Sequence, residues 1–195
     1  MLFLSDFANL GLVLPLTGLV ALTLVVLGKR REAFAWCLAI AGTLGTMGLL
    51  KVLVFVVVGS QAGDGLNNPS GHTASGTVVY AGLLALVGGR FAPRMSIALL
   101  AGLAFGLLFG FSRIELQVHT LADVLVGGAV GLGGVLVLVR LAGPHRIDVR
   151  VTGMPVVAVV ALATMLAFHG QRLLAESELR AIAAHIQSVS DRAFN

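Results

Sequence analysis

The hydrophobic residues of this chain fall into six long runs that short polar segments separate. A helix needs roughly 17–25 mostly apolar residues to cross a bilayer. The pattern therefore predicts six membrane spans, and several of them are short for a full crossing, which favours a site sunk into one face of a helix bundle. The runs cover about residues 8–28, 33–58, 73–89, 95–111, 120–140 and 153–169.

The segment after the last run has a different pattern. Over about residues 171–192, apolar side chains recur on one helical face and polar side chains occupy the other. We expect a short amphipathic helix that lies at the membrane interface. The predicted fold is an all-α, polytopic membrane bundle of about six transmembrane helices plus this helix, in a single domain over residues 1–195.

Composition agrees with a membrane protein. Of 195 residues, 57% are hydrophobic and 11% are charged, and the mean hydropathy is +0.99, which excludes an ordinary soluble domain. The single cysteine, Cys37, rules out an intrachain disulfide and a cysteine-rich metal site, and we expect it to be a small core residue.

Basic residues gather in alternate loops, so they lie on one side of the predicted membrane. By the positive-inside rule that side is the cytoplasm, and the high isoelectric point gives no reason to expect nucleic acid. Loops 59–72 and 112–119 then face the periplasm or exterior, as both termini would with six spans. The localisation that we predict is a bacterial inner membrane. The basic residues are Lys29, Arg30 and Arg31, then Arg90 and Arg94, then Arg140, Arg146 and Arg150.

Glycines recur at helical spacing within the predicted spans. Small residues let membrane helices approach closely, so we expect these positions to be packing contacts. They form three sets: Gly102, Gly106 and Gly110; Gly127 and Gly131; and Gly42, Gly45 and Gly48.

The first candidates for chemistry are His119 and Asp123. They lie four residues apart at the predicted start of a helix and so share a face. A carboxylate there can accept the Nδ1 proton of the imidazole, which directs the Nε2 lone pair outward, as in nucleophile–base–orienter systems. The alternative is a pair that only caps the helix.

Arg113 lies six residues before His119 in the same short loop. A guanidinium is a planar, permanently charged phosphate ligand, and Ser112 can add a hydroxyl donor. An interfacial arginine that extends its charge to water is the alternative.

The sequence Pro69-Ser70-Gly71-His72 immediately precedes the third span. A helix N-terminus offers backbone N–H groups and a dipole that favour an anion, and Gly71 has no Cβ to block the approach. His72 can protonate a leaving oxygen as a general acid. Ser70 as an ordinary N-cap is the alternative.

Lys51 is the formal charge placed deepest in a predicted span, eight residues before Gly59, so about 12 Å below the loop on a straight helix. It needs an anionic partner, which a bound phosphate or Asp123 can supply. A structural lysine that extends to the interface is the alternative.

Together these residues resemble the type 2 phosphatidic-acid phosphatase family, which is related to the vanadium-dependent haloperoxidases. That family is recognised by the motifs K-x6-R-P, P-S-G-H and S-R-x5-H-x3-D, and the chain matches the last two residue for residue over roughly residues 45–135. In the first motif Lys51 fits, but Val58 and Gly59 occupy the Arg-Pro positions. One phosphate-binding arginine is therefore missing.

The resemblance implies an integral-membrane, bacterial-type hydrolase that needs no metal or other cofactor. His119 would attack phosphorus to form a phosphohistidine, Asp123 would orient it, and His72 would act as acid and then as base. The phosphate oxygens would be held by Lys51, Ser70, Gly71, Ser112 and Arg113.

The expected substrate is a phosphomonoester or pyrophosphate of a membrane lipid, and the oligomeric state stays open. A lipid phosphotransferase that uses the same phosphohistidine is one alternative. A non-catalytic relative that binds lipid phosphate is another, and a small transporter or channel is a third.

Overall fold

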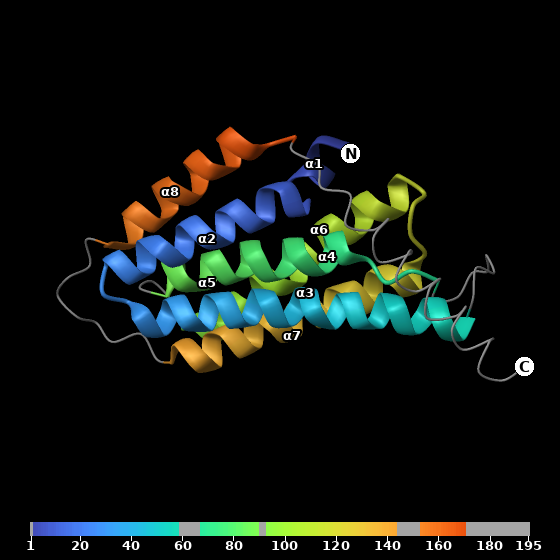
Figure 1. The fold of residues 1–195 in the computed structure, drawn as a ribbon, viewed down its shortest axis with the longest axis horizontal. Coiled ribbons are helices and arrows are strands. Elements are labelled where there is room, and N and C mark those ends of the chain that lie inside the picture. Colours follow the sequence, from blue (N-terminus) through green and yellow to red (C-terminus); the bar gives the residue numbers. More distant parts are fainter. Residues whose placement is uncertain (1, 59–66, 90–92, 144–152, 171–195) are drawn as a thin grey trace, which may run out of the picture.

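The computed structural model describes residues 2–58, 67–89, 93–143 and 153–170, and within them every regular element is helical (Figure 1). The elements are α1 (Leu2–Asp6), α2 (Leu10–Val26), α3 (Arg30–Val58), α4 (Gly71–Gly76), the π-helical turn η1 (Thr77–Ala81), α5 (Gly82–Gly88), α6 (Arg94–Glu115), α7 (Leu121–Ala142) and α8 (Gly153–Phe168). The predicted amphipathic helix at 171–192 lies outside the described residues.

Helices stand at all six predicted positions, with α4, η1 and α5 together forming the third. Of the described helices, α3, α6 and α7 are long and apolar enough to cross a membrane. Helices α2 and α8 are equally apolar but shorter, at 17 and 16 residues. The expected all-α membrane bundle is confirmed, and Figure 1 shows its long helices side by side along one axis.

The run α4–η1–α5 lies at the centre of the bundle, in contact with α3, α6 and α7. Its residues 73–82 are all buried, and most of them are small. Small side chains at these positions let three longer helices pack around one axis. The start of this central run is the Ser-Gly-His sequence, so its neighbours necessarily approach that motif.

Most of the glycines predicted to pack on α6 and α7 make close contacts, whereas a Cβ at Gly106 would meet its nearest atom at an ordinary 3.6 Å. A Cβ at Gly131 would lie 2.7 Å from the carbonyl oxygen of Ala74, and one at Gly102 would lie 2.5 Å from Leu132 Cδ1. A Cβ at Gly110 would overlap Val124 Cγ1. These helices therefore pack at a separation that only glycine allows.

The prediction for the glycines of α3 is wrong. No described atom outside the helix's own backbone lies within 4 Å of a Cβ built at Gly42, Gly45 or Gly48. The packed face of α3 instead carries Trp36, Ile40 and other buried residues. Cys37, expected in the core, is also exposed, because it follows Trp36 and points away from that face.

Two arginines close the C-terminal end of α7. Arg31 Nε donates to the carbonyl oxygen of Leu141 at 2.6 Å, and Arg94 Nη1 donates to that of Gly143 at 3.0 Å. Arg94 also lies 3.7 Å from the Glu32 carboxylate and is 5% exposed. Cations at a helix C-terminus satisfy its last carbonyls and stabilise its dipole. Arg94 is therefore a structural contact as well as a positive charge of the predicted cytoplasmic side.

The glycine contacts predict opposite outcomes for two positions on α7. Gly131→Ala should lower the unfolding midpoint in detergent by about 3–10 °C, because the new methyl group overlaps the Ala74 carbonyl. Gly133→Ala, two residues away, meets no described atom within 4 Å and should leave the midpoint unchanged or slightly raised. Equal midpoints for the two variants in a thermal-unfolding scan would contradict this packing.

Candidate active site

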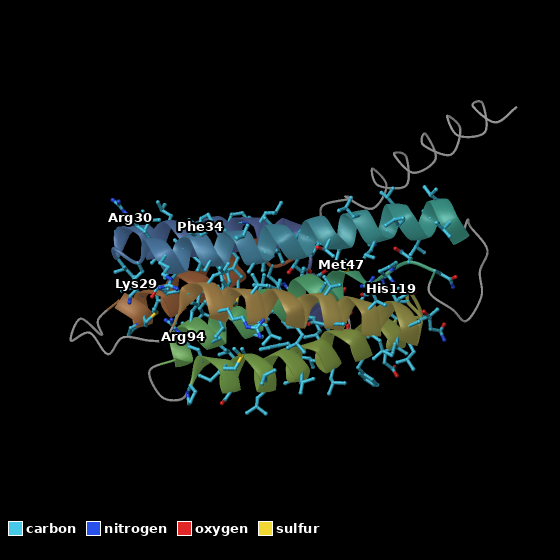
Figure 2. All side chains as sticks on the ribbon, turned by 90° about the horizontal axis from the view of Figure 1, so that it is seen from below. Lys29, Arg30, Phe34, Met47, Arg94 and His119 are labelled. Carbon is cyan, nitrogen blue, oxygen red and sulfur yellow. The ribbon has the colours of Figure 1, made fainter. Side chains whose placement is uncertain are left out.

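The three motif regions come together at one end of the bundle. Figure 2 shows His119 at the opposite end of the molecule from Lys29, Arg30 and Arg94. Helix α4, which begins with the Ser-Gly-His sequence, contacts α3, α6 and α7. The candidate residues of all three motifs therefore lie near the N-terminus of α4, away from the basic end.

The Asp123 carboxylate is the polar centre of this region. Its Oδ1 accepts hydrogen bonds from the backbone amides of Asn67 at 3.0 Å and Asn68 at 2.8 Å. Its Oδ2 accepts one from the amide of Thr120 at 3.0 Å, while the Thr120 hydroxyl accepts from the Asp123 amide at 3.2 Å. Asp123 is thus half of a capping box that begins α7, and it also holds the loop that leads to Pro69.

His119 precedes α7 and lies beside Asp123. Its Nδ1 is 3.7 Å from Asp123 Oδ2, and the two side chains are only 3% and 2% exposed. The separation exceeds hydrogen-bond length, and such contacts are commonly long before substrate binds. The structure is therefore compatible with both interpretations of this pair. Asp123 caps the helix, and it also lies where it can orient His119.

The Ser70 side chain acts as the N-cap of α4. Its Oγ accepts from the Thr73 amide at 3.3 Å and lies 2.9 Å from the Thr73 hydroxyl. The Ser70 amide donates to the Asp123 carbonyl oxygen at 3.0 Å. A Cβ at Gly127 would overlap the Ser70 carbonyl oxygen, so α7 packs directly on this turn. Ser70 is fully buried and fixes the turn, while its contact with phosphate stays a prediction.

Gly71 and His72 are the first two residues of α4, and both are half-buried. A Cβ at Gly71 would lie 3.6 Å from Lys51 Cε, so the Lys51 side chain extends along α3 to this turn. The structure thus brings the lysine of the first motif to the second motif. Val58 ends α3, and Gly59 lies outside the described residues.

Ser112 and Arg113 lie in the last turns of α6. The Ser112 side chain is fully buried, and its hydroxyl has no hydrogen-bond partner among the described residues. A buried hydroxyl in that state costs about 1–3 kcal/mol, which a ligand oxygen would offset. Arg113 Nη1 donates to the hydroxyl of Ser5 on α1 at 2.7 Å.

Ser5 is the site neighbour that sequence reasoning missed. It lies in a five-residue helix before the first long span, and no motif or periodic pattern marks it. The only available signal is that a polar side chain within an apolar N-terminal segment needs a partner once it is buried.

The assembled groups suit the transfer of a phosphoryl group. A buried imidazole beside a fixed carboxylate is a potential nucleophile, and a second imidazole opens the adjoining helix. A lysine reaches the same turn, and an arginine lies in the last turn of α6, which packs against α4. Among the described residues, no group of three His, Cys, Asp or Glu side chains could hold a metal ion. That the reaction needs no metal remains a prediction.

Comparison with known proteins agrees with this chemistry. No curated protein and no solved structure matches the chain. The family model described as the PAP2 superfamily matches residues 32–147, which is more than half of the chain and contains all three motif regions. With helices at the expected positions and the motif residues gathered at one end, this chain belongs to the PAP2 superfamily.

Proposed function

We propose that this protein is a metal-independent, integral-membrane phosphatase. It hydrolyses a phosphomonoester or pyrophosphate of a membrane lipid through a phosphohistidine, at the non-cytoplasmic face. Membership of the PAP2 superfamily supports phosphatase activity on phosphate esters. The observation that carries the finer proposal is the Asp123 carboxylate, which lies beside His119 and also holds the loop before Ser70.

In the first step His119 Nε2 attacks phosphorus. An N–P bond forms as the bond between phosphorus and the lipid oxygen breaks, and His72 gives its proton to the departing oxygen. Asp123 accepts a hydrogen bond from the Nδ1–H group of His119, which keeps its proton, and stabilises the imidazolium that develops. For this hydrogen bond to form, the Nδ1–Oδ2 distance has to shorten by roughly 0.7 Å from the observed 3.7 Å.

In the second step water attacks the phosphohistidine. His72 is now neutral and takes a proton from that water as the N–P bond breaks, which releases inorganic phosphate and restores both histidines. Lys51, Arg113, the Ser112 hydroxyl and the Gly71 amide hold the non-bridging oxygens during both steps. Ser70 contributes by fixing the turn at which those oxygens bind. Such a clamp accelerates transfer by positioning and by stabilising charge.

A groove between α3 and α7 supports a lipid as the substrate. It has a volume of about 360 Å³ and is lined by residues that include Leu38, Thr46, Gly133 and Val137. Thr46 and Leu38 lie five and 13 residues before Lys51, so about 7.5 and 20 Å below it along the helix. One leaflet of the hydrocarbon core is about 15 Å deep. The groove therefore lies near the mid-plane of the bilayer and toward the basic end, where only the far end of a long lipid chain held at the site would reach it.

The arrangement of charge supports the non-cytoplasmic face. Lys29, Arg30 and Arg94 lie at the end of the bundle opposite His119 (Figure 2), and basic residues favour the cytoplasmic side. In the proposed bacterial inner membrane, this arrangement supports a site that faces the periplasm or exterior.

The nucleophile assignment predicts that His119→Ala abolishes turnover. Phosphate release from a panel of lipid phosphates, measured in detergent with EDTA, should fall at least about 1000-fold. Wild-type enzyme quenched during turnover should carry acid-labile phosphate that His119→Ala lacks. Near-wild-type release by the variant would remove the assignment. Transfer of the phosphate to a second lipid would instead favour the phosphotransferase alternative.

If the groove holds a lipid chain, filling it should change KM in a way that depends on the length of that lipid chain. Gly133→Leu should raise KM about 5-fold or more for a long-chain lipid phosphate, because its side chain fills the groove, and should leave a short-chain analogue nearly unaffected. Gly45→Leu is the matched control, since Gly45 is exposed on α3 with open space around it and does not line the groove. Equal effects on both substrates would show that the groove holds no substrate chain.

The orientation can be tested with an impermeant thiol reagent. In a Cys37→Ala background, which removes the one native thiol, Ala62→Cys should be labelled in intact cells or right-side-out vesicles. Labelling only from the cytoplasmic side would reverse the proposed topology.

A further inference from the structure

We propose that Ser5 is a positioning residue of the phosphate site, which sets the orientation of the Arg113 guanidinium. The inference rests on the proposed function, in which Arg113 holds phosphate oxygens. It adds the N-terminal segment, residues 2–9, to a site that the family motifs place on α3, α4, α6 and α7.

The contact itself is short and partly shielded from water. Arg113 Nη1 donates to Ser5 Oγ at 2.7 Å, and Ser5 is 6% exposed. A hydrogen bond from a charged donor is about twice as strong as one between neutral groups. An arginine side chain loses up to about 2 kcal/mol of rotamer freedom when it is fixed. Because the bond to Ser5 fixes the Arg113 side chain before the anion binds, less rotamer freedom is lost when it does. The bond itself uses one of the five N–H groups of a guanidinium.

The N-terminal segment is itself tied to the helix that carries His72. The Ser75 hydroxyl donates to the carbonyl oxygen of Ala8 at 2.8 Å, and the Tyr80 hydroxyl donates to that of Phe7 at 2.7 Å. Ser75 lies three residues after His72 in α4, and Tyr80 lies in η1. In the wider π-helical turn, residues five apart come nearer to one face than in an α-helix. Ser5 therefore places Arg113 relative to the helix of the candidate acid, although the two belong to different helices.

The missing arginine of the first motif increases the importance of this contact. With Val58 at that position, Arg113 is the single guanidinium among the three motifs. A clamp with one bidentate ligand depends on the direction of that ligand, because no second guanidinium can compensate for a rotated plane.

The test is a double-mutant cycle with orthovanadate as the probe, on the full-length protein in detergent. The dissociation constant is taken from the vanadate-dependent rise in the unfolding midpoint. Ser5→Ala should weaken binding about 5- to 10-fold, while Ser5→Thr keeps the hydroxyl and should restore most of it. In an Arg113→Ala background, Ser5→Ala should have no further effect. Additive effects, or wild-type affinity for Ser5→Ala, would overturn the proposal.

Tyr80→Phe is the matched control for a merely structural role. It removes the bond to Phe7 from the same N-terminal segment but does not touch Arg113. It should lower the midpoint and change the vanadate dissociation constant less than about 2-fold. A change as large as that of Ser5→Ala would mean that docking of the whole segment matters, and not the Ser5 hydroxyl.

Phosphate release from lipid phosphates, measured on the same variants, separates the two proposals. Wild-type hydrolysis with unchanged vanadate affinity in Ser5→Ala rejects the role of Ser5 alone. Weakened vanadate binding in Ser5→Ala without any wild-type hydrolysis rejects the hydrolase alone. A wild-type protein that does not bind vanadate rejects both.

Discussion

One buried carboxylate, that of Asp123, determines the geometry of the candidate site. A charged group inside a membrane protein is stable only when hydrogen bonds replace the water that it has lost. Three backbone amides supply those bonds, one from the start of α7 and two from the loop before Pro69. Because backbone amides are part of the chain path, satisfying this charge also fixes where the Ser-Gly-His turn lies relative to His119. The carboxylate proposed to orient His119 is therefore also the group that holds these two segments together.

The same cost explains why the candidate residues stand out in the sequence. Histidine, arginine and aspartate are costly in an apolar chain, so each stands out against its surroundings, and their spacing at helix ends indicates a shared site. The helices were predictable for the same reason, since long apolar runs have few other stable conformations in lipid. The resemblance over residues 45–135 agrees with the family match over residues 32–147.

The packing contacts were harder to predict, because they depend on which face of each helix is buried. The sequence of a helix that is apolar on all sides gives little indication of that face. Helix α3 is hydrophobic on most sides, so the sequence does not indicate that Trp36 packs inward while Cys37 and Gly45 face outward. Backbone amides such as those of Asn67 and Asn68 are invisible to motif reasoning, because any residue there offers the same N–H group. Ser5 was missed because its partner is 108 residues away.

The two ends of α7 are both held, by the Asn67 and Asn68 amides that bond to Asp123 at one and by Arg31 and Arg94 at the other. The helix has 22 residues, so its length is about 33 Å, close to the roughly 30 Å thickness of a hydrocarbon core. A helix fixed at both ends cannot slide along its axis when the bilayer becomes thinner or thicker. We expect the bundle to respond by tilting as one body or by deforming the bilayer around it, and not by sliding of α7. We therefore expect the distances between His119 and the proposed phosphate-binding residues to stay the same in membranes of different thickness.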